Sequence, residues 1–91
     1  MEIIIKGVLV HSLNDIEIFD IKANDSNKMF IIGRLEYEKA KAIRILKRLQ
    51  IEGKIKSLSR PKNKQMQEEI NKLILTKKVI NKSIDSIKMY F

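Results

Sequence analysis

The first third of the chain alternates short apolar runs with polar segments, in the manner of a small sheet. The apolar runs at 3–10, 16–22 and 28–32 are rich in Ile and predict three strands. The connections at 11–15 and 23–27 are rich in Asn, Asp and Ser, which are turn residues. Connections this short favour an antiparallel meander.

The first predicted strand, 3–10, is apolar on both faces. This pattern predicts a central strand that is covered on both sides, or a strand that meets a partner chain. Gly7 within it marks a bulge or a close backbone approach.

The period changes to that of a helix over residues 36–52. One side of this helix is apolar and predicts a face that packs on the sheet, since a three-stranded sheet needs a cover. Gly53 follows, at a position where glycine commonly ends a helix. The apolar stripe consists of Leu35, Ala42, Ile45, Leu46 and Leu49.

A second helix is predicted from residue 64, after a basic loop that contains Pro61. Apolar residues recur there at alternating spacings of four and three, a heptad pattern. Packing on the core of its own chain is the commoner meaning of this pattern, and a dimer seam is the alternative. The seam residues would be Ile70, Leu73, Lys77, Ile80, Ile84 and Ile87.

Two segments of the second half have competing interpretations. Residues 54–59 alternate polar and apolar, so they could form a short edge strand. The second helix could stop near Ile80, because Asn81, Ser83 and Asp85 are poor helix formers, and 86–91 could then form a final strand.

The predicted fold class is therefore α+β, as a single domain over 1–91. An N-terminal three-stranded antiparallel meander occupies 1–35, and a basic helical part occupies 36–91. The central amphipathic helix packs against the meander and is followed by the second helix. Ninety-one residues suffice for one such domain.

Charge divides the chain in the same way. The net charge is +8, but residues 1–35 carry four bases and five acids, whereas residues 36–91 carry fifteen bases and six acids. The two parts therefore have net charges of −1 and +9. Such asymmetry indicates a polyanionic partner or an anionic surface.

The bases of residues 39–64 give the candidate binding site. On the predicted helix, Tyr37, Lys41, Arg44 and Arg48 form a row opposite the apolar stripe, and Lys47 lies beside it. A solvated face is the ordinary interpretation of such a row, but the bases continue beyond the helix. The predicted nucleic-acid-binding residues are Tyr37, Lys41, Arg44, Lys47, Arg48, Lys54, Lys56, Arg60, Lys62 and Lys64.

Acids within the helix could neutralise part of this row. Glu38 can pair with Lys41, and Glu52 can pair with Arg48. As exposed pairs, each would contribute only about 0.2–0.5 kcal/mol.

No arrangement of residues predicts an enzyme. The chain lacks cysteine, has one histidine, His11, and has no glycine-rich phosphate loop. We therefore expect no catalytic residue, no metal and no cofactor. The apolar runs are too short to cross a bilayer, so a cytoplasmic protein without membrane contact is expected.

Residues 38–58 resemble the end of a winged-helix domain. The resemblance rests on Ala42, on the run 45–49 (Ile-Leu-Lys-Arg-Leu) and on 53–56 (Gly-Lys-Ile-Lys). It implies that the helix leads into a wing strand and that 54–64 is wing-like. It covers less than a quarter of the chain, and residues 1–35 read as strands where that family has helices, so we do not assign the family.

These observations predict a small nucleic-acid-binding protein, for DNA or RNA, that contacts phosphates through the helix 36–52 and the 54–64 segment. The alternative is a protein-interaction module, an inhibitor or adaptor that binds an acidic surface of a partner protein. Self-association as a homodimer through the heptad is compatible with either function.

Overall fold

The computed structural model describes residues 1–57 and 64–91, with side chains for 1–52 and 64–91. Two antiparallel strands precede two long helices, so the α+β class is confirmed. The elements are β1 (Glu2–Ser12), β2 (Asp15–Asn24), α1 (Lys28–Ser57) and α2 (Lys64–Tyr90).

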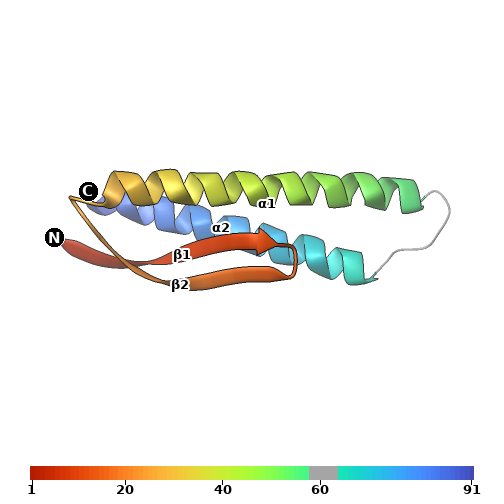
Figure 1. Cartoon of the computed structure of the whole chain (residues 1–91), viewed down its shortest axis with the longest axis horizontal. Coiled ribbons are helices and arrows are strands. Elements are labelled where there is room, and N and C mark those ends of the chain that lie inside the picture. Colours follow the sequence, from red (N-terminus) through yellow and green to blue (C-terminus); the bar gives the residue numbers. More distant parts are fainter. Residues whose placement is uncertain (58–63) are drawn as a thin grey trace.

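The molecule is elongated, with extents of 55 × 21 × 16 Å. The two helices run side by side in opposite directions (Figure 1). The β-hairpin lies along the first half of α1 and the last half of α2, so the far end of the helix pair extends beyond it (Figure 1). One half of the molecule therefore contains the hairpin and both helices, and the other half contains the two helices without the hairpin (Figure 1).

The hairpin pairs β1 with β2 from Glu2↔Asn24 to Val10↔Ile16, with an irregularity before Ser12. Gly7 lies opposite Phe19, and a side chain at Gly7 would collide with the side chains of Phe19 and Ile21. The space beside Gly7 is therefore occupied by side chains, and neither a bulge nor the predicted close backbone approach is seen there. The small size of Gly7 lets these two β2 side chains lie over β1.

The core draws on all four elements. From β1 it takes residues on both strand faces, which a twisted two-stranded ribbon can turn toward the same helices at different points. The predicted α1 stripe is confirmed, with Ile45 only partly buried. The buried apolar cluster consists of Ile5, Val8, Val10, Ala23, Ile31, Leu35, Ala42, Leu46, Leu49, Leu73, Ile80, Ile84 and Ile87.

The predicted third strand at 28–32 is wrong, because these residues form the first turns of α1. The Ile31 N–H donates to the Asn27 carbonyl, as in the opening turn of a helix. Ile31 and Leu35 are both buried, so the apolar stripe begins before residue 36 and is continuous. Tertiary burial on this stripe outweighs the strand preference of the local sequence.

The predicted end of the first helix is also wrong, and of the two interpretations of 81–91 the structure shows the helix. Helix α1 continues through Gly53 to Ser57, so residues 54–57 form neither an edge strand nor a wing strand; residues 58–59 lie outside the described residues. Helix α2 continues past Ile80 to Tyr90, so 86–91 is not a strand.

Serine hydroxyls explain how α2 tolerates poor helix formers in its last turns. Ser83 donates to the Lys6 carbonyl of β1 at 2.6 Å, and Ser86 donates to the Lys82 carbonyl at 2.9 Å. Ile84 and Ile87 are buried at helical spacing in the same region. The contact with the hairpin therefore holds this end of the helix in place.

The heptad residues of α2 pack within their own chain. Leu73, Ile80, Ile84 and Ile87 are buried in the core, and Ile70 packs against it. Lys77 is partly exposed beside them. Among the described residues, the apolar side chains of this set thus pack against α1 and the hairpin, and the dimer seam stays a prediction.

Candidate nucleic-acid interface

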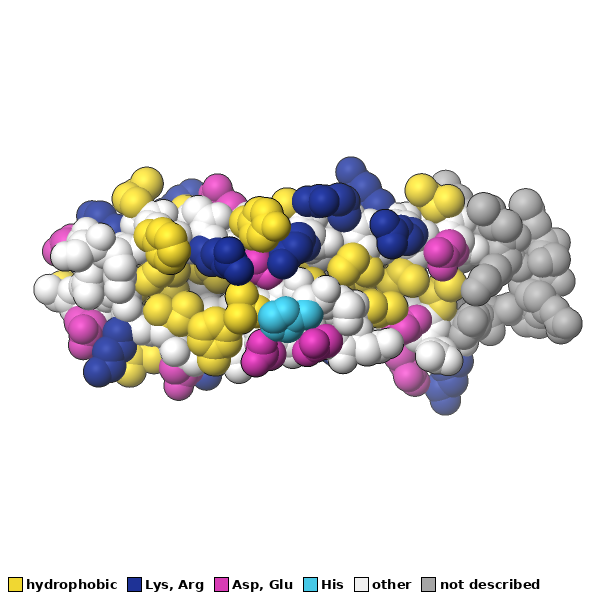
Figure 2. Space-filling model, in the orientation of Figure 1, with side chains coloured by type: hydrophobic (Ala, Val, Ile, Leu, Met, Phe, Trp, Pro, Cys, Tyr) yellow, Lys and Arg dark blue, Asp and Glu magenta, His cyan; other side chains and the backbone are white. Residues whose placement is uncertain are grey.

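The outer face of α1 carries the predicted row. The side chains of Arg44, Lys47 and Arg48 are exposed, and Tyr37 is 52% exposed. Figure 2 shows Lys and Arg side chains gathered along the upper side of the molecule, over α1. The geometry that the sequence predicted for this row is present, with the cations turned away from the core.

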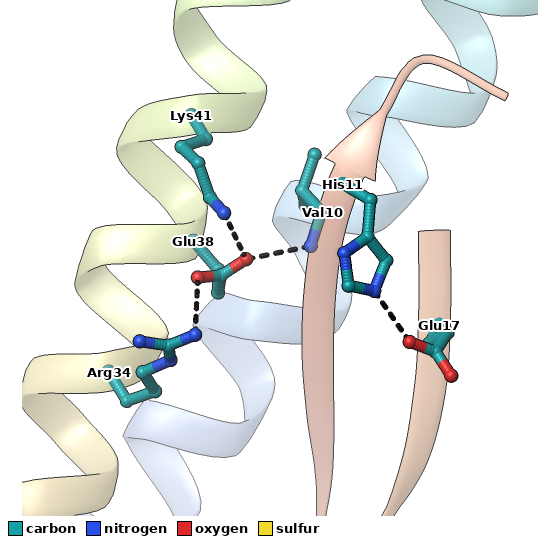
Figure 3. A network of polar contacts seen from close by, with 6 residues as sticks. All are labelled: Val10, His11, Glu17, Arg34, Glu38 and Lys41. Atoms are coloured by element: carbon teal, nitrogen blue, oxygen red, sulfur yellow. Dashed lines mark hydrogen bonds and ion pairs between the residues drawn. The ribbon is translucent and has the colours of Figure 1, made fainter. Parts of the chain in front are cut away.

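Lys41 is held by a buried acid. Glu38 is 0% exposed, and its Oε1 accepts from the Val10 N–H of β1 at 2.7 Å and lies 3.0 Å from Lys41 Nζ (Figure 3). Glu38 Oε2 lies 3.6 Å from Arg34 Nη2. The predicted Glu38–Lys41 pair is therefore present, but Glu38 is buried. It accepts a hydrogen bond from β1 on the edge of that strand that does not pair with β2.

This burial changes what Lys41 can do. A carboxylate without water needs its cations and its backbone donor, because an unpaired buried charge is strongly destabilising. The Lys41 side chain is only 28% exposed, and its ammonium pairs with the buried carboxylate of Glu38. It remains at the edge of the row, where it can add to the potential there.

Tyr37 stands among cations. Its ring has Arg34 Cζ at 5.5 Å and Lys41 Nζ at 5.0 Å from the centroid, both within the range of cation–π contacts. The two cations beside Glu38 are therefore also the ones that lie near the Tyr37 ring. Tyr37 thus lies between the buried acid and the exposed row.

The three remaining cations of the row have no acidic partner among the described residues. Within residues 1–52 and 64–91, no ion pair joins Arg44, Lys47 or Arg48 to an acid, and the predicted pair of Arg48 with Glu52 is not formed. The acids of the N-terminal third pair locally instead. Lys6 Nζ lies 2.6 Å from Asp20 Oδ1, and His11 Nε2 lies 2.6 Å from Glu17 Oε2 (Figure 3).

The other predicted contact residues are distributed differently. Lys54 and Lys56 belong to the last turns of α1, where side chains are not described, and Arg60 and Lys62 lie outside the described residues. Lys64 is exposed as the first residue of α2. The structure thus brings together the members of the set that lie between residues 37 and 48.

Two members of this face were missed by the sequence analysis. Phe30 and Arg34 extend the row toward the N-terminus, since 30, 34, 37, 41, 44 and 48 follow one another at spacings of four and three. The helical spacing of Ile31, Leu35 and Ala42 was the available signal. It was overlooked because 28–32 was assigned to a strand.

Other kinds of site find little support among the described side chains. No group of three His, Asp or Glu residues in that part of the chain could hold a metal ion. In the same part, neither long helix is apolar enough over a sufficient length to span a membrane.

Comparisons with known proteins add no family to this description. The chain matches no protein-family model, no curated protein and no solved structure.

Proposed function

We propose that the protein binds nucleic acid through the outer face of α1, with Arg44, Lys47 and Arg48 on the phosphates. The observation that carries this proposal is that these three cations are exposed, adjacent and without an acidic partner among the described residues. Arginine can also contact a phosphate through two parallel hydrogen bonds.

The energetics favour such a ligand. Each cation that neutralises a phosphate releases condensed counterions, so binding weakens steeply as salt increases. Cations that already pair with carboxylates would release fewer, which makes the unpaired state of these three important. Lys41 and Arg34 contribute less, because Glu38 already uses them.

A salt titration tests the proposal. Binding of labelled single-stranded and duplex oligonucleotides is measured by fluorescence anisotropy at several salt concentrations, for the natural chain and for Arg44→Gln/Lys47→Gln/Arg48→Gln. We expect the triple variant to lower the slope of log K against log salt by about 2 to 3.

A matched control removes three lysines from exposed positions of α2, as Lys72→Gln/Lys78→Gln/Lys88→Gln. Both triple variants lower the net charge equally, so only a local site distinguishes them. Equal losses in the two variants would reduce the effect to overall charge. Weak, salt-independent binding by the natural chain would reject the nucleic-acid proposal. Binding to the acidic surface of a partner protein would then be the remaining function for this face.

A further inference from the structure

Aromatic side chains gather beside the cationic row. The chain has five aromatic residues, and Phe19, Phe30 and Tyr37 line two adjoining depressions, one between the hairpin and the first half of α1 and one on α1 alone. One, of about 250 Å³, is walled by Leu9, Phe19, Ile21 and Phe30 among others. Figure 2 shows apolar side chains concentrated in this region, left of the centre of the view.

The two depressions form one surface because they share Phe30 and Arg34. The second, of about 370 Å³, is lined by Met29, Phe30, Gly33, Arg34 and Tyr37. Together they extend from the hairpin, across α1, to the beginning of the cationic row. We call this surface the aromatic groove.

Phe30 is the unusual member of the groove. It is 77% exposed, although it lies on a helix whose opposite side is well buried. The core does not use it, so its large apolar ring stays in water unless a ligand covers it. Met29 beside it is 70% exposed, so the exposed apolar area is continuous rather than a single residue.

The neighbours of Phe30 indicate the chemistry of that ligand. The apolar wall is bounded by the Arg34 guanidinium, and the cations continue along the same face of α1 to Arg48. From Phe30 to Arg48 this face is about 27 Å long at 1.5 Å per residue. A ligand that fits the whole face has a flat apolar group at one end and several negative charges along its length.

We propose that the aromatic groove receives unpaired bases, so that the ligand of the α1 face is a single-stranded polynucleotide. This inference rests on the proposed function. An aromatic platform beside a cationic track is how proteins bind single strands without sequence readout, and arginine planes stack on bases as well. A duplex keeps the faces of its bases stacked inside, so it offers Phe30 no unpaired base.

The test compares Phe30→Ala with Met89→Ala, which removes an equally exposed apolar side chain (76%) from α2, at a site that does not line the groove. Both variants should fold as the natural chain does, which circular dichroism verifies. Affinity is measured for twelve-residue oligo-dT and oligo-U and for a twelve-base-pair duplex.

We expect Phe30→Ala to weaken binding of the single strands by about 5- to 100-fold, the range for loss of base stacking, and to leave duplex binding within twofold. Met89→Ala should change neither. A single strand that contains 2-aminopurine should lose fluorescence when it binds the natural chain, because a stacked base is quenched, and should lose less with Phe30→Ala.

The outcomes separate this inference from the proposed function. Equal binding of duplex and single strand, together with no effect of Phe30→Ala, overturns the groove inference alone. Absence of binding to all three oligonucleotides overturns both. Binding of a hydrophobic peptide that Phe30→Ala abolishes, with oligonucleotide affinity unchanged, would also overturn the groove inference.

Discussion

Both halves of α1 carry several cations, but these cations have different surroundings in the two halves. In the first half, which lies beside the hairpin, Arg34 and Lys41 flank the buried carboxylate of Glu38. In the second half, which extends beyond the hairpin, Arg44, Lys47 and Arg48 have no acidic partner among the described residues. A count of lysines and arginines along the helix would treat the two groups as equal.

The difference follows from what covers the helix. The hairpin buries one acid, and the backbone N–H of Val10 needs an acceptor at the outer edge of β1. A buried carboxylate in that position requires nearby cations, so Arg34 and Lys41 in the first half stabilise the fold. Beyond the hairpin, no described acid pairs with Arg44, Lys47 or Arg48, which is the basis for proposing that they bind a ligand.

Among substitutions that test this difference between the two halves, Glu38→Ala should lower the free energy of unfolding most. It removes the acceptor of the Val10 N–H and leaves a void, so we expect a loss of about 3 kcal/mol in the free energy of unfolding. Urea denaturation followed by circular dichroism measures it. Glu38→Gln keeps an acceptor of the same shape and should lose less, about 1–2 kcal/mol. A loss below about 0.5 kcal/mol in both variants would show that the buried acid does not join α1 to β1.

Lys41→Met should cause the next largest loss in the free energy of unfolding. It keeps the apolar stem of the side chain but removes the cation that lies nearer to Glu38. Lys41 Nζ lies 3.0 Å from the carboxylate and is mostly covered. We expect a loss of about 1–2 kcal/mol, less than for a fully buried partner since Arg34 remains. The loss should vanish when Glu38→Gln is already present, and a double-mutant cycle measures this coupling. Additive losses would mean that Lys41 stabilises the fold by packing alone.

Arg34→Met should cost less, about 0.5 kcal/mol. Its guanidinium lies 3.6 Å from Glu38 Oε2 and its side chain is 53% exposed, so water screens much of the attraction. The same denaturation experiment measures it. If Arg34→Met costs more than Lys41→Met, the ranking of the two cations by distance and exposure is incorrect.

The sequence predicted the face of α1 better than its boundaries. The stripe with Leu35, Ala42 and Leu46 and the opposite row with Arg44 and Arg48 both follow from helical spacing. The helix start was misplaced because Met-Phe-Ile-Ile at 29–32 has the composition of a strand. Only the contact of Ile31 with the core, which is a tertiary fact, decides between the two.

The sequence predicted the pair of Glu38 with Lys41 but not the burial of Glu38. Spacing along one helix gives the neighbours of a side chain on that helix, not what another element lays over it. Burial of Glu38 depends on Val10, which is 28 residues away. The aromatic groove could not be predicted for the same reason, since Phe19 and Phe30 line one depression only when the hairpin packs on α1.

The smallest effect is expected in the second half of α1, and its sign completes the comparison. Arg44 is three residues from Lys47 and four from Arg48, so these like charges repel one another along the helix. Each such pair costs about 0.2–0.5 kcal/mol at low salt. Arg44→Gln should therefore leave the free energy of unfolding unchanged or raise it slightly, by less than about 1 kcal/mol, and the gain should fade as salt is added. A destabilisation comparable to that of Lys41→Met would mean that Arg44, too, is committed to the fold, and the division of the helix into a structural half and an available half would fail.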